Sequence, residues 1–383
     1  MNPPEKPKFV CLVILDGWGL AAAGPGNAIS QANTVNMNRF ISSYPHTQLR
    51  ASGESVGLPG GEAGNTETGH LNLGAGRIVY QDLARISMSI ADGTFFSNQT
   101  LIDSIAHAKK FNSALHIMGL IGSGGVHSNL EHLYAILQLC KRLQFTNVFL
   151  HLFTDGRDSP PTSSKVYIKT IRDLISRDGI GQIASIMGRY WAMDRDFRWD
   201  RTAKAYFALT KGVGQYIATP EEAVDKSYAM GKTDEFIEPS IILNANKQPV
   251  ATIKDNDSVI FSNFRVDRPR QLTSAFVFKD FHPENISWGF DPYLVKYTKS
   301  HLSKATPHKD GFVRGEALKN LYFVTMTEYA KPLVQAGAHA AFPPETVEMP
   351  LGRVVSENDL KQLRMSESEK ERFVTFYFNG LQE

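Results

Sequence analysis

The chain has 383 residues, of which 42% are hydrophobic and 21% charged, and its formal net charge is +2. This length exceeds what one hydrophobic core usually serves, so two compact units are expected. The composition argues against long disorder. With a near-neutral net charge, any anion must be held by a local cluster of basic side chains rather than by the field of the whole molecule, which argues against nucleic acid as the main partner.

The chain also lacks the signals of a membrane or secreted protein. No apolar run approaches the length that spans a bilayer, and no apolar core follows the charged N-terminal residues. The two cysteines, Cys11 and Cys140, each lie in an apolar stretch, which predicts buried thiols rather than a disulfide. We therefore expect a cytoplasmic protein that does not bind membranes.

The first predicted element is a strand over residues 9–15, a continuous apolar run that ends at Asp16-Gly17. Similar runs predict further strands of parallel sheets at 115–120, 148–153, 183–187, 259–264 and 321–326. Apolar residues at helical spacing predict helices around 130–137 and 166–174. Because strands and helices alternate, the predicted fold class is α/β.

Two later segments depart from this pattern. Segment 283–318 shows little periodicity, and we expect it to be an insertion or a connector. The apolar run 373–378 predicts a strand that needs covering on both faces, yet the chain ends at Glu383. We therefore expect the C-terminal region to be an interrupted domain.

Polar residues follow the predicted strands, at the sheet edge where ligands of open α/β folds bind. Five of them are arginines: Arg157, Arg189, Arg195, Arg265 and Arg268. The guanidinium group matches phosphate and carboxylate in bidentate geometry. Any one of these arginines could merely pair with a neighbouring aspartate at the surface. As a set, they predict a site for a ligand that carries both phosphate and carboxylate.

Three other residues each allow more than one interpretation. Asp16 could ligate a metal or close a turn with Gly17. Thr66, in the segment Gly-Asn-Thr-Glu-Thr-Gly-His, could belong to a helix cap with Asn65 or act as a nucleophile stabilised by metal. His127, in a glycine-rich loop, could donate a proton, contact phosphate, or be an ordinary loop histidine.

A series of motifs in order along the chain resembles the 2,3-bisphosphoglycerate-independent phosphoglycerate mutases. They lie at 15–19 (LDGWG), 64–82, 124–128 (GGVHS), 154–161 (TDGRDSPP), 188–196 and 263–271. The resemblance implies an α/β protein with an alkaline-phosphatase-like discontinuous domain, incomplete here, and an inserted α/β transferase domain. The implied domains are 1–81, 82–318 with the insertion near 283–318, and 319–383.

The resemblance also implies an activity and a set of roles. The implied enzyme is an isomerase of glycolysis that interconverts 3-phosphoglycerate and 2-phosphoglycerate through a phosphorylated enzyme hydroxyl. It would be a monomer and would use two Mn²⁺ ions. Thr66 would be the nucleophile, and Asp16 and Thr66 would ligate metal. The implied substrate-binding residues are His127, Arg157, Asp158, Arg189, Arg195, Arg265, Arg268 and Lys370.

The sequence departs from the family in two respects. Thr66 replaces the family's serine, and its extra methyl group restricts the side-chain rotamers. The Asp-x-Val-Gly-His and Ala-Asp-His-Gly-Asn patterns, which supply most of the family's metal ligands, do not occur. We therefore expect a truncated chain with an incomplete metal site and doubtful activity by itself. Two alternatives stay open: a non-catalytic phosphoglycerate-binding fragment, and a metal-dependent phosphatase of the same superfamily.

Overall fold

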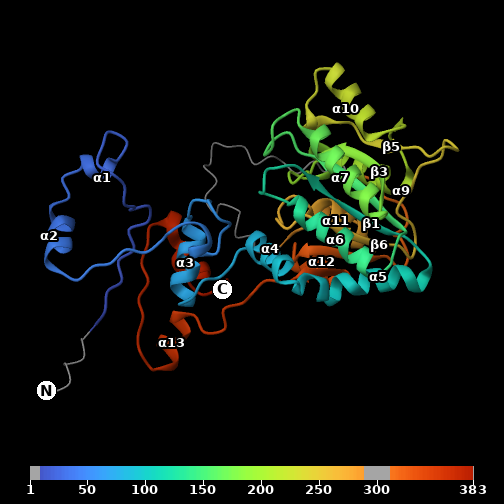
Figure 1. Cartoon of the computed structure of the whole chain (residues 1–383). Helices are drawn as coiled ribbons and strands as arrows, with labels where there is room; N and C mark the ends of the chain where they lie inside the picture. Colours follow the sequence, from blue (N-terminus) through green and yellow to red (C-terminus); the bar gives the residue numbers. More distant parts are fainter. Residues whose placement is uncertain (1–8, 289–310, 383) are drawn as a thin grey trace. The chain divides into compact units, whose positions relative to one another are not determined.

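The computed structural model describes residues 9–288 and 311–382, which divide into two compact units (Figure 1). Unit 1 consists of Met1–Tyr80 and Thr346–Glu383, and unit 2 of Gln81–Glu345. The middle of the expected insertion, 289–310, lies outside the described residues. Both classes of element occur and the strands form one large sheet, so the α/β class predicted from the sequence is confirmed.

Unit 2 is built on an eight-stranded sheet with the order β4-β5-β3-β2-β1-β6-β7-β8. The strands are β1 (Leu115–Ile121), β2 (Val148–Thr154), β3 (Gln182–Gly188), β4 (Gln215–Ile217), β5 (Ser240–Ile242), β6 (Ser258–Phe261), β7 (Tyr322–Thr327) and β8 (Ala338–Phe342). The α-helices are α4 (Asp82–Asp92), α5 (Gln99–Phe111), α6 (Leu130–Arg142), α7 (Ser164–Asp178), α8 (Arg189–Ala192), α9 (Trp199–Lys211), α10 (Pro220–Ala229), α11 (Arg270–Val277) and α12 (Lys331–Gln335). Short 3-10 turns are η2 (Thr94–Ser97), η3 (Asp234–Phe236) and η4 (Pro283–Asn285).

The strands from β3 through β8 in this order run parallel, and β5 joins β3 antiparallel. Strand β6 ends at Phe261, earlier than predicted, and the Asn263 side chain beyond it accepts a hydrogen bond from the Leu120 backbone at 2.9 Å. Residues 319–345 were expected in the discontinuous domain, but they contribute β7 and β8 to this sheet. Strand β7 pairs with β6, and β8 pairs with β7.

Helices cover both faces of the sheet, which makes a three-layer unit (Figure 1). On β1, Ile117 and Ile121 pack into a core shared with α5, α6 and α7, whereas Met118 and Leu120 pack into a core shared with α9, α11 and α12. A strand buried on both faces is mainly apolar along its length. This explains why the longer strands of unit 2, such as β1 and β2, are visible in the sequence as apolar runs.

Unit 1 contains short helices and no named strand among its described residues. Its elements are α1 (Ala28–Gln31), α2 (Val35–Ser43), η1 (Gly53–Val56), α3 (Thr66–Ala75), α13 (Leu351–Glu357), η5 (Ser368–Lys370) and the π-helix η6 (Phe373–Tyr377). Helix α3 packs closely against η6, since a side chain on Gly74 would overlap the carbonyl oxygen of Phe378. Leu71, Val79 and Val347 form the buried cluster of this unit.

The strands predicted at 9–15 and 373–378 are both wrong. Residues 9–15 form no strand, and Phe9 and Val10 are 81% and 84% exposed. A strand needs a neighbour for its backbone hydrogen bonds, and all named strands of the described residues lie in unit 2. The segment 373–378 satisfies its backbone locally, in the π-helix η6.

The two cysteines differ in environment. Cys140 is buried on α6, as predicted, and burial raises the pKa of its thiol to about 12. Cys11 is exposed, so the prediction that it is buried is wrong, because it belongs to the segment that forms no strand.

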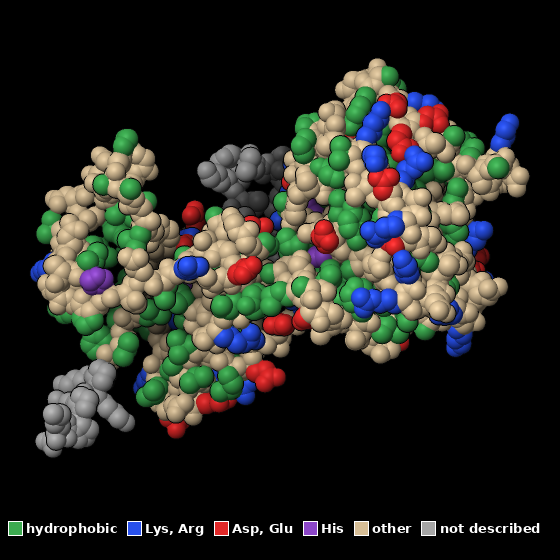
Figure 2. Space-filling model, in the orientation of Figure 1, with side chains coloured by type: hydrophobic (Ala, Val, Ile, Leu, Met, Phe, Trp, Pro, Cys, Tyr) green, Lys and Arg blue, Asp and Glu red, His purple; other side chains and the backbone are tan. Residues whose placement is uncertain are grey.

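Charges of both signs are interspersed on the face of unit 2 drawn in Figure 2. The ion pair between Arg172 on α7 and Glu221 on α10, at 2.8 Å, is one example. Among residues 9–288 and 311–382, none of the helices combines the length and the apolar character that crossing a bilayer requires.

Candidate functional site

The loops after β1, β2, β3 and β6 meet at one edge of the sheet. Strands β2 and β3 lie on one side of β1, and β6 lies on the other, so the strand order reverses beside β1. Such a reversal opens a crevice beyond the carboxyl ends of the strands, where open α/β sheets bind ligands. Most of the predicted substrate-binding residues follow these four strands.

Arg189 is the most deeply buried of the predicted arginines. It lies at the end of β3 with 2% of its side chain exposed, and its Nη1 donates to Asp155 Oδ1 and to Asp158 Oδ2, each at 2.6 Å. Burial opposes ionisation of Asp158, but the hydrogen bond and charge of Arg189 outweigh it and hold the pKa of Asp158 below its usual value. The predicted residues Arg189 and Asp158 therefore form one buried ionic cluster.

Asp155, which was not among the predicted site residues, organises two loops. Its Oδ2 accepts from Ser159 Oγ at 2.7 Å, and Ser159 Oγ accepts from the backbone N–H groups of Ser123 at 2.9 Å and Gly124 at 3.2 Å. Gly124 must lack a side chain, because a Cβ there would overlap the Asp158 carbonyl. The sequence signal for Asp155 is its place directly after the apolar run of β2.

His127 lies between two carboxylates. Its side chain is 5% exposed, with Nε2 3.7 Å from Asp158 Oδ2 and Nδ1 3.7 Å from Asp267 Oδ1. Burial, followed by the nearby charge of Arg189, lowers the pKa of His127 to about 4, so the imidazole is neutral near pH 7.

The guanidinium groups of Arg195, Arg265 and Arg268 reach the same region from different loops. Arg195 Nη1 and Arg265 Nε donate to opposite oxygens of Asp267, at 2.7 Å and 3.1 Å. Arg268 Nη1 donates to the Met193 carbonyl at 3.1 Å. Burial and then the charge of Arg189 lower the pKa of Arg268, which indicates that cations are crowded here.

Arg157 differs from this group. Its side chain is 55% exposed, and Nη1 pairs with Glu235 Oε1 at 3.3 Å. It follows β2 as predicted, but it forms the kind of surface ion pair that was the alternative interpretation for every arginine of the set.

Several buried polar atoms of this cluster have no hydrogen-bond partner among the described residues: His127 Nδ1, Arg189 Nε and Arg268 Nε. Such atoms are costly in an interior unless a ligand or water satisfies them. Their concentration at one place, in a cluster of cations, indicates an anion-binding site.

Asp194 was also absent from the predicted site residues, and it links two segments near the site. Asp194 Oδ2 accepts from the backbone of Arg198 at 2.9 Å and from Gln271 Nε2 at 3.0 Å. These bonds join the segment after β3 to helix α11. Burial raises the pKa of Asp194, although the hydrogen bond from Arg198 opposes that shift.

Unit 1 brings together the other three predicted residues, Asp16, Thr66 and Lys370. Thr66 Oγ1 donates to Asp16 Oδ2 at 2.7 Å, Lys370 Nζ donates to the same oxygen, and Lys370 Nζ lies 3.5 Å from Thr66 Oγ1. The hydrogen bond from Lys370 holds the pKa of Asp16 below its usual value; burial opposes this shift, and the hydrogen bond from Thr66 adds to it. Asn65 caps α3 by accepting from the Thr68 backbone at 2.9 Å, which confirms the predicted helix start.

The residues around Asp16 do not fit a site for two divalent ions. Asp16 and Thr66 supply one carboxylate and one hydroxyl group, and the ammonium group of Lys370 already pairs with the carboxylate. Within the described ranges, no group of three or more His, Cys, Asp or Glu side chains is placed to hold a metal ion. Divalent cations need several oxygen or nitrogen ligands in a defined geometry, so these residues alone support no metal-dependent step.

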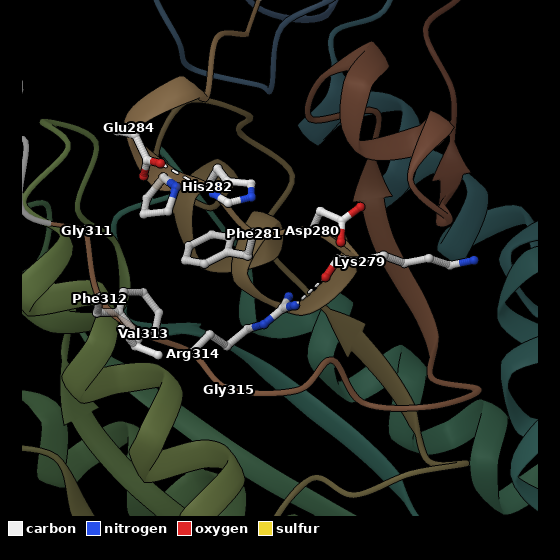
Figure 3. Close-up of a pocket in the computed structure, with 11 residues that line it drawn as sticks. Lys279, Asp280, Phe281, His282, Glu284, Gly311, Phe312, Val313, Arg314 and Gly315 are labelled. Carbon is white, nitrogen blue, oxygen red and sulfur yellow. Dashed lines mark hydrogen bonds and ion pairs between the residues drawn. The ribbon is translucent and has the colours of Figure 1, made fainter.

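A separate cavity of about 650 Å³ lies next to segment 279–284 (Figure 3). The buried guanidinium of Arg314 at its wall donates to the carbonyl of Ala275 in the last turn of α11 and to the carbonyls of Phe278 and Lys279 just beyond the helix. Because this arginine caps a helix end, it serves a structural purpose, and the predicted substrate-binding residues do not line this cavity.

Comparisons with known proteins point to one family. A family profile described as BPG-independent PGAM N-terminus matches residues 86–331. The 2,3-bisphosphoglycerate-independent phosphoglycerate mutase of Moorella thermoacetica is 49% identical over 369 residues, which cover 96% of this chain and 66% of that protein. The protein of the same name from Chloroflexus aurantiacus is 46% identical over 380 residues, which cover 98% and 67%.

A solved structure, that of Leishmania mexicana phosphoglycerate mutase at low cobalt concentration, has a TM-score of 0.65 and 26% identity. The match covers 93% of this chain and 61% of that one. The chain therefore spans about two thirds of the length of the relatives that it matches.

Proposed function

Because the chain belongs to the 2,3-bisphosphoglycerate-independent phosphoglycerate mutase family, we propose that unit 2 binds 3-phosphoglycerate and 2-phosphoglycerate during their interconversion. One observation carries this proposal: unpartnered buried nitrogen atoms of His127, Arg189 and Arg268 lie in one cluster at the carboxyl ends of the strands. A ligand with a phosphate and a carboxylate would supply the missing acceptors of Arg189 Nε and Arg268 Nε.

The charge state of the cluster suits such a ligand. The guanidinium groups stay protonated, whereas His127 is neutral at pH 7 and can donate or accept one hydrogen bond. Asp158 stays ionised, so it can accept a hydrogen bond from a hydroxyl of the bound glycerate. Held in this way, the glycerate would stay oriented while its phosphoryl group is away.

For the transfer itself, we propose Thr66 as the acceptor of the phosphoryl group. Its Oγ1 would form a bond to phosphorus as the bond between phosphorus and the substrate oxygen breaks, and the proton of the Thr66 hydroxyl would pass through Asp16 to the leaving oxygen. The reverse step, with the proton returning to Oγ1, would deliver the group to the other hydroxyl. Asp16 accepts the hydrogen bond of Thr66 and fixes the direction of Oγ1. Lys370, 3.5 Å from that oxygen, would offset the charge of the arriving phosphoryl group.

Further proposed properties have two sources. Two Mn²⁺ ions and a monomeric state follow from the resemblance, whereas a cytoplasmic location without nucleic-acid or membrane partners follows from the composition and charge. Since Asp16 and Thr66 do not by themselves form a two-ion site, no step above passes through a metal. That mismatch favours a second candidate function, in which the chain binds phosphoglycerate without turnover.

The test combines calorimetric titration of the full chain with 3-phosphoglycerate and an assay of turnover with excess Mn²⁺. We expect saturable binding that Arg268→Ala weakens and Thr66→Ala leaves intact. Turnover that Thr66→Ala abolishes would support the mutase, and binding without turnover would support the second candidate. If the wild-type chain does not bind 3-phosphoglycerate, the proposed function is wrong.

A further inference from the structure

We propose that Asp267 is a positioning residue that holds Arg195 and Arg265 in place and orients His127 for phosphoglycerate binding. This inference rests on the proposed function of unit 2. Asp267 lies in the loop after β6, and its side chain is 10% exposed. Its carboxylate accepts from Arg195 Nη1 through Oδ2 and from Arg265 Nε through Oδ1.

These two bonds join separate parts of the chain. Arg195 belongs to the segment after β3, and 72 positions separate it from Asp267. Arg265 lies in the same loop as Asp267, two residues before it. The carboxylate therefore ties together two loops that meet at the crevice, where β3 and β6 flank the β2-β1 pair.

The same carboxylate is the better acceptor for the imidazole of His127. Nδ1 of His127 lies 3.7 Å from Asp267 Oδ1, and Nε2 lies 3.7 Å from Asp158 Oδ2. The Asp158 oxygen already accepts a short bond of 2.6 Å from Arg189, whereas the Asp267 oxygen accepts a longer one of 3.1 Å from Arg265. The proton of the neutral ring is therefore expected on Nδ1, directed toward Asp267.

Asp267 cannot help an anionic ligand by direct contact, because like charges repel. Its benefit comes through the arginines, whose side chains are 46% and 38% exposed. A long, exposed side chain loses rotamer freedom when it binds a ligand, and prior fixation removes part of that cost. A carboxylate that fixes two such arginines thus improves binding in spite of its own charge.

Asp267→Asn separates this proposal from a purely electrostatic role. If Asp267 acts by positioning, the variant binds 3-phosphoglycerate about tenfold more weakly by calorimetry, and Asp267→Glu, which keeps the charge, recovers most of the affinity. If Asp267 is only a nearby negative charge, Asp267→Asn binds more tightly. Tighter or unchanged binding overturns the proposal.

Asp178→Asn is the matched control. Asp178 also pairs with two cations, Lys141 at 2.7 Å and Arg177 at 2.8 Å, and its side chain is 7% exposed, but it lies at the end of α7. Its variant should leave the affinity for 3-phosphoglycerate unchanged. An equal loss of affinity in both variants would mean a general effect of losing a carboxylate, and it would overturn the proposal.

Nitrogen-15 NMR of the His127 ring in the ligand-free wild-type chain provides a test that needs neither a ligand nor a variant. A proton on Nδ1 supports the role of Asp267, and a proton on Nε2 overturns it. If the wild-type chain fails to bind 3-phosphoglycerate, the proposed function fails, while the ring tautomer still decides whether Asp267 orients His127.

Discussion

Replacing Arg189 by alanine should destabilise unit 2 far more than replacing Arg157, although both arginines follow strands of the same sheet. Arg189 and its partner Asp155 are each 2% exposed, so Arg189→Ala leaves a buried carboxylate without its cation. Breaking a buried pair in this way costs about 3–5 kcal/mol. Arg157 is 55% exposed and pairs with Glu235, and loss of such a surface pair costs about 0–1 kcal/mol.

Urea unfolding of the full chain measures this difference, with the fluorescence of Trp199, which is 1% exposed in unit 2, as the signal. The midpoint should fall strongly for Arg189→Ala and little for Arg157→Ala. A double variant that also carries Asp155→Asn, which keeps a side-chain oxygen to accept from Ser159 but removes the uncompensated charge, should recover part of the loss. Equal stability losses for the two arginines would refute the conclusion that Arg189 has a structural as well as a binding role.

Three further predictions concern single substitutions. Gly124→Ala should weaken 3-phosphoglycerate binding at least about tenfold in calorimetry, because the new methyl group would overlap backbone atoms. The methyl group of Gly125→Ala would contact only a side-chain methyl at 3.3 Å, so this variant should bind within about threefold of wild type. Gly74→Ala should lower the free energy of unfolding by about 1–3 kcal/mol, because its methyl group would overlap backbone atoms. Gly69→Ala, whose methyl group would lie in open space on the same helix, should raise it by up to about 1 kcal/mol. Changes of the same sign in both variants would contradict the packing of α3. Burial lowers the pKa of His132 from 6.5 to about 4, so as the pH falls the imidazole is protonated first in the unfolded chain. The free energy of unfolding should therefore fall between pH 6.5 and pH 4, by up to about 3 kcal/mol. His132→Gln should reduce this dependence of stability on pH, and an unchanged dependence would refute the pKa shift.

The sheet of unit 2 could be predicted from sequence because its strands are buried on both faces. The runs that became β1, β2, β3, β6 and β7 are mainly apolar, with single polar residues such as His116 and His151 inside them. The short strands β4 and β5 carry too few residues to show a pattern, and they were not predicted.

The same rule failed in unit 1, because an apolar run predicts a strand only where other strands pair with it. Residues 9–15 have the composition of a buried strand but no strand partner among the described residues of unit 1, and Phe373–Tyr377 forms a π-helix against α3. Composition records the tendency of a segment, whereas pairing depends on contacts that are distant in sequence.

For the site, the sequence indicated which residues carry charge but not how they are paired. Arg189 and Arg268 were expected from their places after strands, and their burial and unpartnered atoms came from the structure. Asp155 and Asp267 were not predicted as site residues, because an aspartate beside arginines suggests an ordinary surface ion pair. Their structural importance depends on burial, which the spacing of residues does not reveal.

The most direct test of a phosphoglycerate site in unit 2 is NMR of the arginine side chains of the full chain during titration with 3-phosphoglycerate. The Nε–H resonances of Arg189 and Arg268 should shift to saturation, because these atoms have no protein acceptor among the described residues. The resonance of Arg172, which lies on α7 and pairs with Glu221 on α10, should not shift. Saturating binding that leaves Arg189 and Arg268 unchanged, or a complete lack of binding, would contradict the account.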